Sequence, residues 1–190
     1  MGLFERIFGK PKDVQPSGYF LTLNGYSPVF TSAPESVYEM AVTRAAIHSF
    51  ATFCSKLKPE VTGSAAAHLK NTLAFRPNPF QDTAKFLYRI ATILSVHNTA
   101  FIVPIEHPLT GQTVGFYPLL PQYAEFVDVR GEAFVRYRFA NGQRAAIELD
   151  RVGILTGYQY KDELIGESNG ALRPTMQLIH AQNEGIIKGV

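Results

Sequence analysis

The sequence predicts an α+β protein with N-terminal helices, an antiparallel hairpin-rich sheet and a C-terminal helix. Three observations indicate this class. Apolar residues recur at helical spacing in two segments before residue 98, they alternate with polar residues from residue 100 onward, and helical spacing returns after residue 170. A chain of 190 residues, 46% of them hydrophobic, has enough apolar material for one domain with an extension.

The first 18 residues are expected to form an N-terminal arm and a linker, and residues 19–190 the α+β region. Residues 2–9 give a short amphipathic turn whose apolar members are Leu3, Phe4, Ile7 and Phe8. Two helical turns are not stable alone, so this arm is expected to dock on its own chain or on another protein. Residues 10–17 form the linker, and residues 19–30 could hold a brief strand broken at Asn24-Gly25.

The first long helix is predicted over Ser36–Leu57, after Pro34 and before Pro59, which cannot continue it. A second, short helix is predicted within Gly63–Leu73. The first helix should bury a stripe of Met40, Ile47, Phe50, Cys54 and Leu57, while Ala41, Ala45, Ala46 and Ala51 leave room for close helix packing.

A capped helix is predicted over Pro79–Val96. Asn78 has the chemistry of an N-cap, Pro79 suits the first helical position, and Gln81 falls three residues after the cap. The expected buried stripe consists of Phe86, Leu87, Ile90, Ile93 and Leu94.

From Ala100 onward the pattern predicts hairpins. Segments 100–106 and 113–117 flank a turn at 109–111, and segments 123–129 and 133–140 flank Arg130-Gly131. Asn141-Gly142, a strong hairpin signal, leads to segment 144–149, and Val152–Leu155 can add a strand. Val135, Tyr137 and Phe139 alternate with Arg136 and Arg138, as in a sheet with one solvated face.

The last segment is predicted to turn at Gly166–Gly170 and then to form an amphipathic helix. An apolar helix face needs a partner to cover it, so the chain is expected to be the N-terminal part of a longer protein. The residues that mark this helix are Pro174, Met176, Leu178, Ile179 and Ile186.

Composition excludes several classes of protein. Eighteen basic and sixteen acidic side chains give a net charge of +2, far from the balance of a dedicated duplex-DNA binder. The one cysteine, Cys54, excludes an internal disulfide, suits a reducing cytoplasm and is expected to be a buried, inert thiol. No apolar run is long enough to cross a bilayer.

The sequence gives only weak signals for a metal, phosphate or polyanion site. The histidines have no metal-ligand spacing, and His97 and His107 would lie at opposite ends of one strand. No glycine-rich phosphate-binding motif occurs, so no cofactor is expected. The hairpin arginines could touch a polyanion, but a solvated sheet face shared with Glu132 and Glu148 is favoured. The remaining histidines are His48, His68 and His180, and the arginines are Arg130, Arg136, Arg138, Arg144 and Arg151.

Gly166–Gly170 spells G-x-S-x-G, the nucleophile elbow of serine hydrolases, with Ser168 at its centre. That elbow needs a strand directly before it and a helix directly after it. Here polar, turn-like residues 160–163 precede it and Pro174 is expected to interrupt the run that follows. The partners are also in the wrong order, because His180 comes before Glu184. No catalytic residue is assigned, and the chain is not expected to be an enzyme.

Five short motifs, in this order along the chain, resemble the motifs of a known protein family. They are Tyr38–Ile47 (YEMAVTRAAI), Arg76–Phe80 (RPNPF), Asn98–Phe101 (NTAF), Phe116–Leu119 (FYPL), and Leu164–Ser168 (LIGES) with Leu172–Thr175 (LRPT). Together they cover most of residues 36–190, and the arrangement resembles the N-terminal half of the tailed-bacteriophage portal proteins. Residues 19–190 would then be the outer, wing-type part of a subunit, truncated at its C-terminus.

The resemblance implies a structural subunit of a ring, usually a dodecamer, at one vertex of the phage head. Such a ring forms the DNA packaging and ejection channel and connects head to tail. Expected partners are further copies of the chain, the major capsid protein, terminase, head–tail adaptor proteins and double-stranded DNA that passes without sequence specificity. The motor, not the portal, hydrolyses ATP. The expected location is the virion, after synthesis in the bacterial host cytoplasm. Two alternatives stay open: another phage connector or minor capsid protein, and a small serine hydrolase that uses Ser168.

Overall fold

The computed structural model describes residues 38–121, 124–129, 131–138 and 144–188. The predicted N-terminal arm, the linker, the Asn24-Gly25 turn, Phe139 and the Asn141-Gly142 turn lie outside the described residues.

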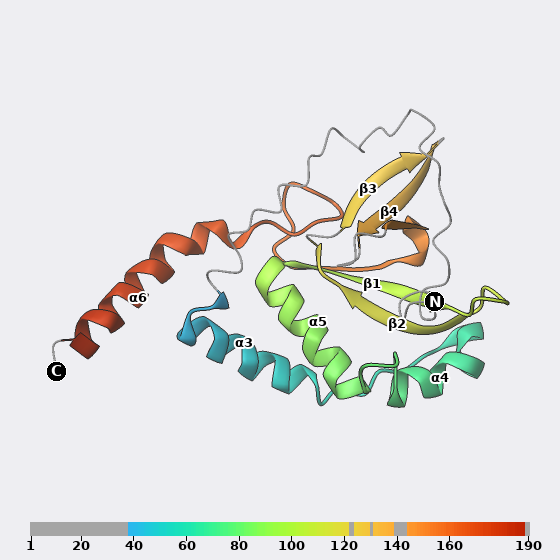
Figure 1. The fold of residues 1–190 in the computed structure, drawn as a ribbon, viewed down its shortest axis with the longest axis horizontal. Helices are drawn as coiled ribbons and strands as arrows, with labels where there is room; N and C mark the ends of the chain where they lie inside the picture. The colour runs from blue at the N-terminus through green and yellow to red at the C-terminus, as the bar shows by residue number, and fades with distance from the viewer. Residues whose placement is uncertain (1–37, 122–123, 130, 139–143, 189–190) are drawn as a thin grey trace.

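The predicted α+β class is confirmed (Figure 1). Helices α3 (Ala41–Cys54), α4 (Ala66–Phe75) and α5 (Thr83–His97) come first, and helix α6 (Arg173–Lys188) comes last. Between them six strands divide into two antiparallel three-stranded sheets, a division that the alternating pattern does not reveal. The first sheet has the strand order β2-β1-β6 and consists of β2 (Thr113–Leu119), β1 (Thr99–Glu106) and β6 (Gly153–Thr156). The second sheet has the strand order β3-β4-β5 and consists of β3 (Ala124–Val129), β4 (Glu132–Arg138) and β5 (Arg144–Glu148).

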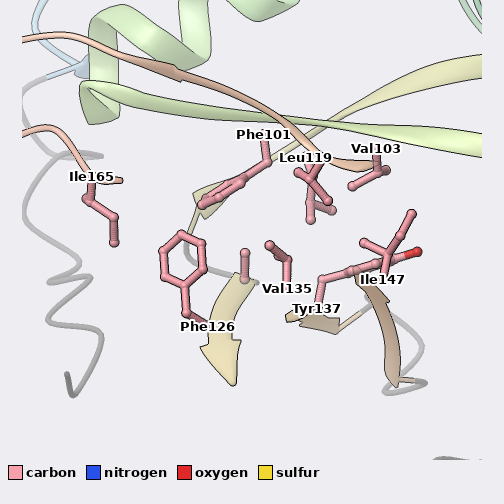
Figure 2. Packing of buried hydrophobic residues seen from close by; sticks show 10 residues of the cluster. Phe101, Val103, Leu119, Phe126, Val135, Tyr137, Ile147 and Ile165 are labelled. Atoms are coloured by element: carbon pink, nitrogen blue, oxygen red, sulfur yellow. The ribbon is translucent and has the colours of Figure 1, made fainter. Parts of the chain in front are cut away.

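The core lies between the two sheets (Figure 2). Phe101 on β1 meets Phe126 on β3 edge to face, with ring centroids 5.8 Å apart. Tyr137 on β4 is buried beside them, and this burial, followed by the nearby charge of Glu106, raises its pKa to about 12. The same layer contains Val103, Leu119, Ala124, Val135, Ile147, Val152 and Ile165.

Strand β1 is buried on both faces. Helix α5 packs against β1 and β2 on the side away from the core. Seven consecutive residues of β1, Thr99–Ile105, are therefore buried or nearly so. Burial on both faces explains why residues 100–105 form a continuous apolar run, although alternation was expected from residue 100 onward.

Helix α3 differs from its prediction in length and in its buried face. It begins at Ala41 and ends at Cys54, inside the predicted Ser36–Leu57. Its completely buried residue is Ala51, whereas Phe50 is 52% exposed and Leu57 is 58% exposed. A small side chain lets α3 approach α5 closely. Met40 and Ile47 of the predicted stripe are half-buried, and Phe50 and Leu57 are left at the surface.

The N-cap predicted for the third helix was wrong. Helix α5 begins at Thr83, and its cap is Asp82, whose Oδ1 accepts a hydrogen bond from the backbone N–H of Lys85 at 2.8 Å. Asn78 instead shapes the turn before the helix, because its Oδ1 accepts from the N–H of Phe80 at 3.0 Å. The predicted stripe was largely right: Phe86, Ile90 and Ile93 are buried together with Ala91.

The Asn78 side chain also ties this turn to the sheet. Its Nδ2 donates to the carbonyl oxygen of Phe116 on β2, and the N–H of Phe116 donates to the carbonyl oxygen of Pro77, at 3.0 Å and 2.8 Å. Strand β2 is an edge strand, so these bonds occupy part of its free edge. Gly115 permits the approach, since a Cβ there would lie 2.4 Å from the carbonyl oxygen of Pro77.

Helix α6 leaves the body of the molecule. In Figure 1 it runs outward beyond the N-terminal end of α3 and the C-terminal end of α5. Most of its side chains are exposed, apolar ones included. The predicted C-terminal helix is therefore present, and its apolar face is not part of the core.

Replacing Phe101 should test the core. Phe101→Ala is expected to lower the free energy of unfolding by about 3–5 kcal/mol, because a large ring buried to 1% exposure leaves a cavity. The matched control is Leu109→Ala in the β1–β2 turn, which is 90% exposed and should change stability by less than about 0.5 kcal/mol. Urea unfolding followed by circular dichroism measures both, and equal effects of the two changes would contradict this account of the core.

Candidate interaction surface

Ser168 lies at an exposed turn rather than at a nucleophile elbow. Strand β6 ends at Thr156, so no strand runs directly into the G-x-S-x-G segment. The Ser168 Oγ accepts a hydrogen bond from the N–H of Gly170 at 3.1 Å, and the residue starts a short 3-10 turn, Asn169–Leu172. The expectation that Pro174 breaks the following run was wrong, because Pro174 lies in the first turn of α6, where proline is tolerated.

The histidines stay apart from one another. His97 ends α5 and His107 follows β1, so they lie at opposite ends of that strand, as predicted. His48 on α3 shares a hydrogen bond with the hydroxyl of Tyr88 at 3.0 Å. Within the described ranges, no three His, Cys, Asp or Glu side chains are grouped so that they could hold a metal ion. His68 and His180 are exposed.

Cys54 is a free thiol at the last position of α3. It is half-buried, so the prediction of a buried thiol was too strong. Its location at a helix end, beside the exposed residues 56–58, explains the partial exposure.

Two of the predicted arginines, Arg136 on β4 and Arg151 after β5, pair with carboxylates. Arg136 forms an ion pair with Glu125 on the neighbouring strand at 2.5 Å. Arg151 pairs with Glu106, and with Glu148 at 3.5 Å. Burial lowers the pKa of Arg151, but these two carboxylates outweigh it, and the net effect is a raised pKa. This arrangement fits the solvated sheet face that the sequence favoured. Arg138 and Arg144 lie opposite each other and exposed on β4 and β5, and Arg130 lies outside the described residues.

A buried asparagine, Asn98, joins the C-terminal end of α5 to the segment that leads to α6. Its backbone adopts the left-handed conformation, with φ of 55°, and its N–H donates to Leu94 O at 2.8 Å, which ends the helix. The carbonyl oxygen of Asn98 accepts from the N–H of Gly157 at 2.8 Å. Its side-chain Nδ2 donates to Glu167 O and to Asn169 Oδ1, both at 2.7 Å.

Two further residues complete this Asn98 junction. Asn169 Nδ2 donates to Ser95 O and Val96 O, at 3.1 Å and 3.0 Å, so it satisfies carbonyl groups at the end of α5 that no helical N–H can reach. The Thr99 hydroxyl accepts from the N–H of Gly166 at 2.9 Å. A Cβ at Gly166 would lie 2.1 Å from Asn98 O, so only glycine fits there. The junction therefore fixes where α6 begins.

One apolar groove opens beside this junction. Its volume is about 410 Å³, and it lies between the N-terminal part of α3, the end of α5 and the start of α6. The Thr43 hydroxyl in it is buried and has no hydrogen-bond partner among the described residues. The main lining side chains are Tyr38, Ile47, Phe50, Leu94, Leu172 and Met176.

A second groove lies at the opposite end of the α3–α5 pair, where α3 ends and α5 begins (Figure 1). Its volume is about 660 Å³. Phe80, which is 47% exposed, and Tyr88 give it apolar surface, and Lys85 and Arg89 give it positive charge. Arg89 is held in place, because its guanidinium donates to Tyr117 OH at 3.1 Å and lies 5.0 Å from the centre of that ring.

Half of the exposed large apolar side chains in the described residues lie on helices α3, α4 and α6. Exposed patches of this kind mark interaction surfaces more often than chemistry. No described helix is long and apolar enough to span a membrane. The sequence predicted that the apolar face of α6 needs a partner, but not that Phe50 and Leu57 are exposed, since periodicity alone does not show which apolar stripes find a partner within the chain. The exposed set includes Val42, Phe50, Phe53, Leu57, Phe75, Phe80, Leu172, Leu178, Ile186 and Ile187.

Comparison with known proteins gives a likeness of fold. No protein-family model matches the chain, and no curated protein matches its sequence. A chain from the "neck of native GTA particle computed with C12 symmetry" gives a TM-score of 0.66 at 14% identity, over 91% of this chain and 48% of that one. A chain from the "neck of empty GTA particle computed with C6 symmetry" gives 0.65 at 13% identity, over 90% and 48%.

A third match comes from the "virion of native gene transfer agent (GTA) particle", with a TM-score of 0.64 at 13% identity, over 90% of this chain and 47% of that one. At such identities the likeness shows a shared fold. The chain spans about half the length of each of these three matched chains.

Substituting Asn98 should separate its backbone role from its side-chain role. Asn98→Gly keeps the left-handed turn but loses the amide, and should cost about 1–3 kcal/mol of stability because buried partners lose their hydrogen bonds. Asn98→Ala adds backbone strain and should cost about 1 kcal/mol more. Chemical denaturation measures both, and a glycine variant as stable as the wild type would show that the amide bonds contribute nothing.

Replacing Ser168 tests the hydrolase alternative. Ser168→Ala should lower stability by about 0.5–1 kcal/mol through the loss of a cap and should leave any hydrolysis of nitrophenyl esters at its wild-type level. Ser64→Ala, an exposed serine in another short 3-10 turn, is the matched control. A loss of esterase activity in Ser168→Ala alone would favour the hydrolase.

Proposed function

We propose that this chain is a structural subunit of the neck of a phage-like particle, and specifically the wing-type part of a portal ring. The observation that carries the proposal is the shared fold over 90% or more of this chain with chains from such particles. The portal-like motifs add support from the sequence.

The distribution of polar side chains supports a structural role. Asn78, Asn98 and Asn169 make hydrogen bonds that position backbone segments far apart in the sequence. Among the described residues they do not converge on a cavity with a base and a nucleophile, which acyl transfer would require. The apolar grooves suit contacts between proteins.

A ring is the assembly that we propose. Two of the neighbours come from assemblies described with C6 and C12 symmetry. A subunit in a closed ring needs two different surfaces, one for each neighbour, because the contact is head to tail. This chain has two grooves at opposite ends of the α3–α5 pair.

The wider role follows from the proposal. Twelve copies would surround the channel through which double-stranded DNA enters and leaves the head, and the ring would contact the major capsid protein, terminase and head–tail adaptor proteins within the virion. Another connector or minor capsid protein is the second candidate, because the neighbours' descriptions name the neck and the virion rather than a portal.

Electron microscopy of the purified chain tests the proposal. The expected result is closed rings of one subunit type with a central opening, and two-dimensional classes give the subunit number. A monodisperse monomer at tens of micromolar, confirmed by light scattering, would contradict the ring. Rings with a subunit number other than twelve would still support a ring-forming connector and would contradict the dodecamer.

A further inference from the structure

We propose that helix α6 of one copy packs into the groove at the Phe80 end of the next copy. The "α6 end" means α6 with the loop of residues 157–170, and the "Phe80 end" means residues 55–60 and 80–92. This inference rests on the proposed ring and names the two surfaces that would hold neighbouring subunits together.

Helix α6 presents one apolar stripe. At 100° per residue, positions 172, 176, 179, 186 and 187 fall within an arc of about 100°. Ile186 is 67% exposed, and the stripe continues outward from the groove that Leu172 and Met176 line. Leu178 is also exposed, at 60%, but lies outside this arc. The helix is 16 residues long, about 24 Å, and Figure 1 shows it clear of the body.

The Phe80 end offers a groove for such a helix. It runs from Phe80 and Gln81, which precede α5, along α5 as far as Thr92, and Ser55, which follows α3, also lines it. Phe80 and Tyr88 supply aromatic surface, which suits an amphipathic helix laid into a groove. The small, exposed Ala84 leaves space between them.

Charge favours this pairing over the pairing of like ends. The α6 end carries a net charge of −1, because three basic side chains stand against four acidic ones: Lys161, Arg173 and Lys188 against Asp162, Glu163, Glu167 and Glu184. Residues 55–60 and 80–92 contain four basic and two acidic side chains, a net charge of +2. The α6 end of one copy and the Phe80 end of the next carry opposite charge and therefore attract each other, whereas two α6 ends or two Phe80 ends repel. Salt limits both effects to about one Debye length, roughly 8 Å at physiological ionic strength. The resulting contact is head to tail and can close a ring.

Directed cross-linking tests the contact. In a Cys54→Ser background, one chain carries Ile186→Cys, and a second, tagged to differ in mass, carries Ala84→Cys. Mild oxidation of the mixture is expected to give a disulfide-linked pair with one chain of each kind, at least about tenfold more abundant than linked pairs from either chain alone, a ratio that corresponds to about 1.4 kcal/mol. Abundant Ile186→Cys self-pairs would instead place α6 against α6 across a two-fold axis and overturn the inference.

A pair of matched substitutions separates this inference from the ring itself. Ile186→Gln should shift rings to monomers at concentrations where wild type is assembled, and Leu178→Gln should not. Rings that persist in Ile186→Gln, or rings without the mixed cross-link, overturn the α6 contact and leave the proposed function standing. Absence of rings in the wild type overturns the proposed function. Circular dichroism confirms that both variants keep their helices.

Discussion

The left-handed turn at Asn98 is the constraint on which the rest of the arrangement depends. The last carbonyl groups of a helix have no partner within the helix. Here the Asn169 side chain donates to the carbonyl oxygen of Val96, and the Asn98 side chain donates to Glu167 O and to Asn169 Oδ1. The same few residues set the direction of β1, pair it with β6 through Gly157, and hold the segment before α6. An asparagine suits the position because it tolerates a positive φ and its amide both donates and accepts.

The buried core and the exposed apolar surface lie on different parts of this molecule. The core lies between two sheets, where Phe101, Val103 and Val135 are almost completely buried. Helix α5 packs against strands β1 and β2. Much of the apolar surface of α3 and α6 stays exposed. Such a division lets the fold be stable before it binds, and leaves apolar area for a partner. It also means that substitutions on α6 should affect association more than folding, since the helix buries little within the chain.

The portal-like motifs acquire a physical meaning in three dimensions. Asn78 of the Arg76–Phe80 motif hydrogen-bonds to Phe116 of the Phe116–Leu119 motif, and Asn98 hydrogen-bonds to Glu167, almost seventy residues later. Motifs that are weak one by one are therefore pairs of contacting segments. Glycines at the same two places, Gly115 and Gly166, allow backbone approaches that any side chain would block. These contacts explain why the segments occur together, and they are architectural rather than catalytic.

The sequence by itself determined the elements. Helical periodicity located α5 and α6, alternation located the hairpins, and the context of G-x-S-x-G argued against an elbow, because these signals are local. Boundaries and caps were less certain: Asn78 looked like an N-cap, but a bond to Phe116 thirty-eight residues away decided its role. Only the tertiary structure divided the strands into two sheets, buried Ala51 in place of Phe50, and left the α6 stripe uncovered. Which apolar face is buried depends on what packs against it, and that is set by contacts distant in sequence.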